Sequence, residues 1–233
     1  MTLTRAIVFD FDGTLFHFLI DYMGMRNAVR REVIASGVPA SKFYEDERIR
    51  DVVNKMLDYS KSEGWSDSKV SSLMKKVDSI MDEYEWASAQ GNTPLDGAEE
   101  VLRRLRGERY KTGLLTNNSR RSIEFLLEKY SFSLFFDVIV TRDELVDVNN
   151  LKPSPVGLRR ILGELEVEPN EAMYVGDSVV DVKAALSVGV TPIFVTTGYS
   201  TEKEVREVYP DVLIINDLRQ LLTFLNQKDT SAT

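Results

Sequence analysis

The sequence predicts an α/β fold, namely a doubly wound parallel sheet with an inserted helical block. From Pro94 onward, short apolar runs alternate with stretches of helical period, which is the pattern of parallel strands joined by helical crossovers. Between Phe16 and Gln90 stripes of helical period recur and no convincing strand is indicated. The chain is therefore predicted to be an α/β domain, residues 1–15 and 92–233, interrupted after its first strand by a helical domain, residues 16–91.

The first strand is predicted over Ala6–Phe9, because this run is continuously apolar, as expected of a strand that is buried on both faces. Three helices are predicted in the inserted block. Their apolar positions are Met25, Val29 and Val33 in the first, Ile49, Val52, Val53, Met56 and Leu57 in the second, and Val70, Leu73, Met74, Val77, Ile80, Met81 and Tyr84 in the third. Ser66 or Ser68 is the expected N-cap of the third helix.

The remaining elements follow in alternation. Helices are predicted around 98–105, 123–127, 158–165 and 182–186, and strands at 112–116, 137–140, 172–175, 191–195 and, near the sheet edge, 212–215. Asp217 is expected to cap a last helix through Leu225. The polar end, residues 227–233, is expected to be a disordered tail.

Composition limits the classes of partner. A net charge of −8 over 233 residues argues against a protein that binds nucleic acid by neutralising phosphates. The absence of cysteine excludes disulfides, thiolate metal sites and cysteine nucleophiles. No apolar run approaches the length of a membrane span, and the N-terminus has no signal-peptide core. We therefore expect a cytoplasmic protein with neither a membrane nor a nucleic-acid partner; the sequence carries no signal for an oligomeric state.

Polar residues gather where predicted strands end. Asp10 and Asp12 follow the first strand, and two like charges this close cost energy unless a cation or a shared proton relieves them. Three further segments of this kind are Thr116-Asn117, Lys152-Pro153, and Gly176-Asp177 with Asp181. The carboxyl ends of parallel strands meet in one crevice, so we expect these side chains to lie close together.

The chemistry of these groups fits together. A carboxylate can attack phosphorus, Mg²⁺ prefers carboxylate, water and phosphate oxygens, and a hydroxyl and an ammonium can hold phosphoryl oxygens. Singly, each residue favours a plainer interpretation: Asp177 as a helix cap, Lys152 as a solvated loop lysine, and Thr116 as the last residue of a strand.

As a set, these residues resemble the four ordered motifs of the haloacid dehalogenase (HAD) superfamily. The matching motifs are Asp10-Phe11-Asp12-Gly13-Thr14-Leu15, Leu115-Thr116-Asn117, Lys152-Pro153 and Gly176-Asp177-Ser178-x-x-Asp181. The helical block resembles the C1-type cap of that superfamily, as in its phosphoglycolate phosphatase-like members. The resemblance implies a Rossmann-like HAD core with a cap domain.

The resemblance also implies a role for each residue. Asp10 would be the nucleophile that becomes an aspartyl-phosphate, and Asp12 the general acid that protonates the leaving oxygen and then the base that activates water. Thr116, with the amide of Asn117, would hold the phosphoryl oxygens, and Lys152 would compensate the charge of Asp10 and the phosphoryl group.

The implied cofactor is Mg²⁺. Its ligands would be Asp10, Asp177 and the backbone carbonyl of Asp12. Asp181 would be either a further metal contact through water or a partner of Lys152, and the sequence leaves both open.

The implied function is a Mg²⁺-dependent phosphatase that acts on a small phosphorylated metabolite, with phosphoglycolate as the first candidate. Asp12 favours phosphate chemistry over dehalogenation, because a departing halide needs no proton. The alternatives are a β-phosphoglucomutase-type phosphotransferase, a pyrophosphatase, a nucleotidase, or a catalytically silent binding protein on the same fold. In the cap, Arg26, Arg30 and Arg31 could contact an anionic leaving group, although a charged helix face is more often solvated.

Overall fold

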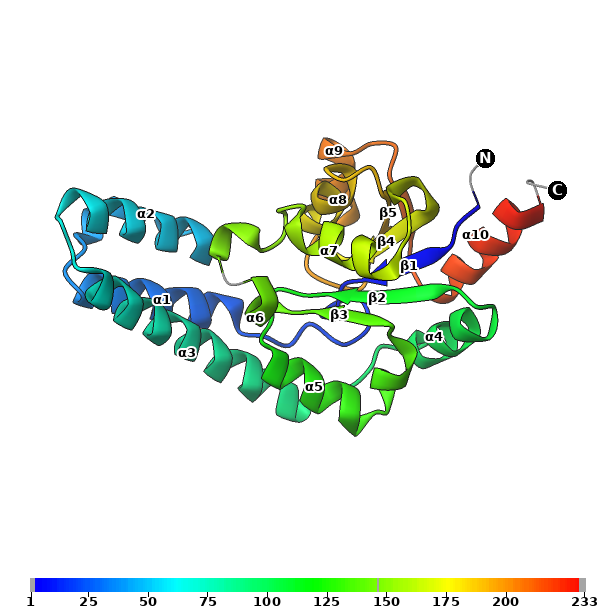
Figure 1. The fold of residues 1–233 in the computed structure, drawn as a ribbon, viewed down its shortest axis with the longest axis horizontal. Coiled ribbons are helices and arrows are strands. Elements are labelled where there is room, and N and C mark those ends of the chain that lie inside the picture. Colours follow the sequence, from blue (N-terminus) through cyan, green and yellow to red (C-terminus); the bar gives the residue numbers. More distant parts are fainter. Residues whose placement is uncertain (1–2, 146, 231–233) are drawn as a thin grey trace. The chain divides into compact units, whose positions relative to one another are not determined.

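The computed structural model describes residues 3–145 and 147–230, which form a sheet with flanking helices and a separate group of helices (Figure 1). By its internal contacts the chain divides into unit 1, Met1–Leu19 with Asn92–Thr233, and unit 2, Ile20–Gly91. Residues 16–19, which the sequence assigns to the inserted block, group with unit 1. The roles of the units as catalytic core and cap remain predictions.

The described part of unit 1 contains a six-stranded parallel sheet in the order β3-β2-β1-β4-β5-β6. The strands are β1 (Ala6–Phe9), β2 (Lys111–Leu115), β3 (Val138–Val140), β4 (Ala172–Gly176), β5 (Thr191–Val195) and β6 (Leu213–Ile215). The chain runs outward from β1 to β3 on one side and from β4 to β6 on the other, so the order reverses at β1. Doubly wound sheets bind their ligands at such a reversal, outside the carboxyl ends of the strands. The predicted fold class is confirmed.

Helices cover both faces of this sheet. They are α4 (Ala98–Gly107), α5 (Arg120–Lys129), the short α6 (Arg142–Leu145), α7 (Val156–Leu165), α8 (Val179–Leu186), α9 (Glu202–Val208) and α10 (Arg219–Thr230). Figure 1 shows α7 and α8 on one face, where they pack on β2–β3 and β4–β5, and α4 on the other. Leu158 and Ile161 of α7 are fully buried against that first face, in a cluster that includes Tyr174 of β4. Short 3₁₀ turns, η2 (Phe132–Phe135), η3 (Val148–Asn150) and η4 (Pro169–Glu171), connect these elements.

Unit 2 contains α1 (Tyr22–Ala35), η1 (Ala40–Lys42), α2 (Ile49–Ser62) and α3 (Asp67–Gly91), and α1 packs on both α2 and α3. Of the two candidate caps for α3, Ser66 is the residue whose Oγ accepts from the Lys69 N–H, at 3.3 Å. Two arginines of α1 contact the chain, whereas Arg31 is exposed. Arg26 lies 3.6 Å from Asp46, and Arg30 donates to the Tyr44 carbonyl at 3.0 Å, so both hold the segment between η1 and α2.

The structure differs from one local expectation. The expected disordered tail begins too early: α10 continues through residues 227–230, and residues 231–233 lie outside the described part. Adding residues to the end of an existing helix does not require the costly formation of a first turn, so α10 can continue through residues 227–230 without apolar side chains. Within residues 3–145 and 147–230, no helix is long and apolar enough to cross a membrane.

Candidate active site

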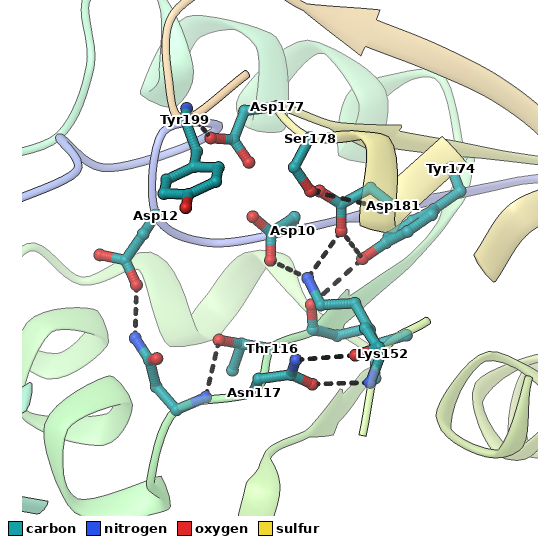
Figure 2. A network of polar contacts seen from close by, with 12 residues as sticks. Asp10, Asp12, Thr116, Asn117, Lys152, Tyr174, Asp177, Ser178, Asp181 and Tyr199 are labelled. Carbon is teal, nitrogen blue, oxygen red and sulfur yellow. Dashed lines mark hydrogen bonds and ion pairs between the residues drawn. The ribbon is translucent and has the colours of Figure 1, made fainter. Parts of the chain in front are cut away.

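Asp10 follows β1 directly and lies at the centre of the polar network in Figure 2. Its backbone N–H donates to the Val175 carbonyl at 2.9 Å, which extends the pairing of β1 with β4 and fixes the residue at the strand end. Its side chain is buried and accepts a hydrogen bond from the Lys152 ammonium. Burial raises the pKa of Asp10 to about 6 against the attraction of Lys152, and the charge of Asp181 adds to the rise.

Lys152 joins two carboxylates. Its Nζ donates to Asp10 and, at 2.8 Å, to Asp181 Oδ1. Burial by itself would lower the pKa of Lys152, but the two carboxylates outweigh it and raise the pKa above its usual value, so the side chain stays an ammonium. The main chain of Lys152 is held by the side chain of Asn117, which accepts from its N–H at 2.9 Å and donates to its carbonyl at 3.3 Å. The sequence does not predict this second task of Asn117.

Asp10, Asp177 and Asp181 form a compact acidic cluster. Each offers one carboxylate oxygen within 4.8 Å of the others, and all three side chains are buried. Burial raises the pKa of Asp177 to about 9, and the charges of Asp10 and Asp181 add to the rise. Three carboxylates beside the one ammonium of Lys152 leave two negative charges uncompensated when all are ionised. Hard oxygen donors with this excess charge fit Mg²⁺.

Asp181 is already engaged by protein donors. Its Oδ1 accepts from Lys152 and, at 3.0 Å, from the Tyr174 hydroxyl, and its Oδ2 accepts from the Ser178 hydroxyl. Gly176 leaves room for this carboxylate, because a Cβ built there would lie 2.5 Å from Asp181 Cγ. Of the two roles that the sequence leaves open, these contacts favour the partner of Lys152.

Asp12 has a different environment. It is half-buried, its carboxylate is not part of the acidic cluster, and its Oδ2 accepts from the side-chain amide of Asn118. The Asn118 N–H also donates to Thr116 Oγ1 at 3.2 Å, and a hydroxyl that accepts keeps its own proton to donate. Asn118 therefore contacts both a predicted acid and a predicted phosphoryl-binding residue. Asn118 was not predicted as a site residue, although it follows Asn117 at the same strand end.

A segment after β5 also reaches the cluster. The Tyr199 N–H donates to Asp177 Oδ2, and Thr197 Oγ1 donates to the Gly13 carbonyl at 2.6 Å. No site residue was predicted in this segment. A signal existed, because β5 is parallel to β4 and its carboxyl end opens on the same edge.

Known proteins resemble this chain over most of its length. The model of the haloacid dehalogenase-like hydrolases matches residues 7–195. A phosphoglycolate phosphatase of Pseudomonas putida is 30% identical over 95% of this chain and 79% of its own. The pyrophosphatase PpaX of Bacillus cereus is 27% identical over 96% of this chain and 98% of its own. A putative haloacid dehalogenase-like hydrolase of Bacteroides fragilis has a similar solved structure, with a TM-score of 0.66, 23% identity, and coverage of 94% of this chain and 99% of its own.

The solved structure supports the fold alone at this identity, whereas the family model spans most of the chain, from β1 through β5. This chain belongs to the haloacid dehalogenase-like hydrolases.

Proposed function

We propose that this enzyme is a Mg²⁺-dependent phosphatase that hydrolyses a small phosphomonoester through a phosphorylated Asp10. One observation carries the proposal: the two aspartates after β1 occupy different environments. Asp10 is buried and paired with Lys152, whereas Asp12 is half-buried and accepts from Asn118. Two carboxylates in unlike surroundings can take different catalytic roles.

The family and the named relatives indicate a hydrolase of phosphate esters. They do not select its substrate, because one relative is named for phosphoglycolate and another is named a pyrophosphatase, at 30% and 27% identity. Phosphoglycolate is our first candidate, and pyrophosphate, a nucleotide and a hexose phosphate are the alternatives. A cytoplasmic location stays a prediction from the sequence.

In the first step, a carboxylate oxygen of Asp10 attacks phosphorus, and the bond from phosphorus to the ester oxygen breaks. Asp12, in its protonated form, gives its proton to the departing alkoxide. The Thr116 hydroxyl donates to a phosphoryl oxygen, and Lys152 balances the negative charge that gathers around Asp10.

In the second step, water attacks the phosphorus of the aspartyl-phosphate. Asp12, now ionised, takes the proton of this water, and the bond between phosphorus and Asp10 breaks to release inorganic phosphate. The proton that Asp12 lost in the first step is thereby restored, and the enzyme returns to its starting state.

Asp10, Asp177 and the backbone carbonyl of Asp12 would hold the metal ion. When bound, Mg²⁺ offsets the charge of the carboxylates and of the phosphoryl oxygens. Asp181 is assigned to Lys152, because both of its oxygens already accept from protein donors.

The test is phosphate release from a panel of phosphomonoesters, pyrophosphate and nucleotides, with Mg²⁺ and with a chelator. We expect Mg²⁺-dependent release that Asp10→Asn abolishes, while Asp211→Asn, a change at an exposed aspartate, keeps the wild-type rate. Full activity of Asp10→Asn would refute the nucleophile. Conversion of β-glucose 1-phosphate to the 6-phosphate without net release would identify the phosphotransferase. Normal Mg²⁺ binding with no turnover of any ester would support a binding protein.

A further inference from the structure

The segment Thr197–Ser200, after β5, encloses the carboxylate of Asp177. The Tyr199 N–H donates to Asp177 Oδ2, and the Ser200 N–H donates to the Asp177 carbonyl at 3.1 Å. Ser200 Oγ in turn accepts from the Val179 N–H at 3.3 Å, in the first turn of α8. Side chain and main chain of Asp177 are therefore both held by one short segment.

The same segment is tied to the turn after β1. Thr197 Oγ1 donates to the Gly13 carbonyl at 2.6 Å, one residue beyond Asp12. A Cβ built on Gly13 would lie 2.7 Å from Gly198 Cα, so the two glycine main chains are in close contact. The segment thus connects the strand end that carries Asp10 with the strand end that carries Asp177.

Asp177 lies in a slot between these two glycines. A Cβ built on Gly198 would stand 2.5 Å from Asp177 Cγ and 2.7 Å from its Cβ, and one built on Gly13 would stand 2.8 Å from Asp177 Cγ. Cβ atoms essentially never approach other atoms within 3.0 Å, so a side chain at Gly198 requires either the Asp177 carboxylate or the main chain of the segment to shift. Gly13 has a positive φ of 75°, but Gly198 has none, so at Gly198 the requirement is for space alone.

The slot and the Tyr199 donor together restrict the orientation of the Asp177 carboxylate. Its Oδ2 is engaged by Tyr199, and in Figure 2 its other oxygen points toward Asp10. Metal affinity depends on partners that hold a ligand in its binding rotamer before the metal arrives, and their loss typically weakens binding by about 10–100-fold.

We propose that Thr197–Ser200 is a positioning segment, which fixes the Asp177 carboxylate so that one oxygen faces the metal site. The proposal rests on the proposed function in one respect, namely that Asp10 and Asp177 bind Mg²⁺. Gly198 supplies the space, Tyr199 the backbone donor, and Thr197 the link to the turn after Asp12.

The test measures the dissociation constant of Mg²⁺ by calorimetry on the full chain, without substrate. Gly198→Ala should weaken binding at least about tenfold. Its matched control is Gly163→Ala in α7, where a built Cβ meets nothing within 4 Å and binding should equal that of the wild type. Thr197→Val keeps the side-chain shape and removes the donor to Gly13, and it should weaken binding by a smaller factor. The Mg²⁺ dissociation constant of Asp177→Asn shows how much binding weakens when one carboxylate ligand is lost.

The outcomes separate the two proposals. If the wild type binds Mg²⁺ no better than Asp177→Asn does, the proposed metal site fails. If Asp177→Asn loses binding while Gly198→Ala and Thr197→Val keep the wild-type constant, the positioning role is refuted and the metal site stands. Should Gly198→Ala not fold, Thr197→Val decides: weaker binding supports the role of the segment, and unchanged binding overturns it.

Discussion

Replacing Asn118 by alanine removes the side-chain donor that contacts Asp12 Oδ2. A hydrogen bond to a charged group contributes about 1.5–3 kcal/mol. Asp12 is half-buried, so solvent screens part of this interaction and the lower end applies, about 1.5 kcal/mol. With about 1.36 kcal/mol for each factor of ten in rate, Asn118→Ala should slow the steps that use Asp12 about tenfold.

The assay compares an alkyl phosphate, whose alkoxide needs a proton to leave, with p-nitrophenyl phosphate, whose phenolate leaves without one. For the alkyl ester, Asn118→Ala should lower kcat/KM about tenfold. For the aryl ester, kcat/KM should stay at the wild-type value, because its first step needs no acid. The kcat for the aryl ester should fall if hydrolysis of the aspartyl-phosphate limits turnover, because that step uses Asp12 as the base.

A merely structural role of Asn118 would lower kcat/KM for both esters alike. Equal losses for the two esters, or no loss for either, would therefore refute our account of Asp12 and Asn118. Asn170→Ala, at an exposed position before β4, is the control and should match the wild type with both esters.

Three further predictions concern charge and packing. Burial raises the pKa of Asp177 to about 9 from an ordinary 3.8, so the folded protein without metal favours the protonated carboxyl and loses stability as the pH rises toward 9. Because Mg²⁺ binds the ionised carboxylate, the increase in Tm on adding Mg²⁺ should become larger from pH 6 to pH 9. An increase in Tm that stays constant or becomes smaller over this range would contradict the prediction. Lys152→Met removes the cation of a buried ion pair, so the free energy of unfolding should fall by about 3–5 kcal/mol. It is measured by urea denaturation in the presence of a chelator, and an unchanged value would argue against the pairing. Leu158→Ala, at a fully buried position in α7, should lower the free energy of unfolding by about 2–5 kcal/mol in the same assay. Val156→Ala, at a position that is 39% exposed, should lower it far less, and similar losses for the two variants would mean that α7 packs differently.

The sequence predicts the fold well because its strands are short, apolar and regularly separated by helical stripes. It predicts the order of the motifs along the chain, and the parallel sheet explains how Asp10 and Asp177 meet, since they follow the paired strands β1 and β4. This proximity depends on the order of the strands in the sheet, and the alternation of strand and helix patterns in the sequence predicts a parallel sheet of this kind. Lys152 was predicted at a strand end, but it follows η3, twelve residues after the end of β3, and reaches Asp10 from that connection.

The positioning groups were not predictable in the same way. Tyr174 belongs to the apolar pattern of β4, and nothing in that pattern indicates that its hydroxyl reaches Asp181. Gly198 matters through close approach to Asp177, and the Tyr199 donor is a backbone N–H that every residue except proline has. Such contacts depend on distances between main chains, which a sequence pattern does not encode.

The central claim is that the phosphoryl group passes through Asp10. The direct measurement is acid quenching of the enzyme during turnover of a labelled phosphomonoester with Mg²⁺, followed by mass spectrometry of the peptides. Our account predicts a phosphorylated peptide with the acid-stable, hydroxylamine-labile bond of an acyl phosphate, located at Asp10 and absent in Asp10→Asn. Asp12→Asn should accumulate this species with an aryl phosphate substrate, because the leaving phenolate needs no acid but hydrolysis still needs a base. Phosphate release by Asp10→Asn at the wild-type rate, or a label on another residue, would contradict the account.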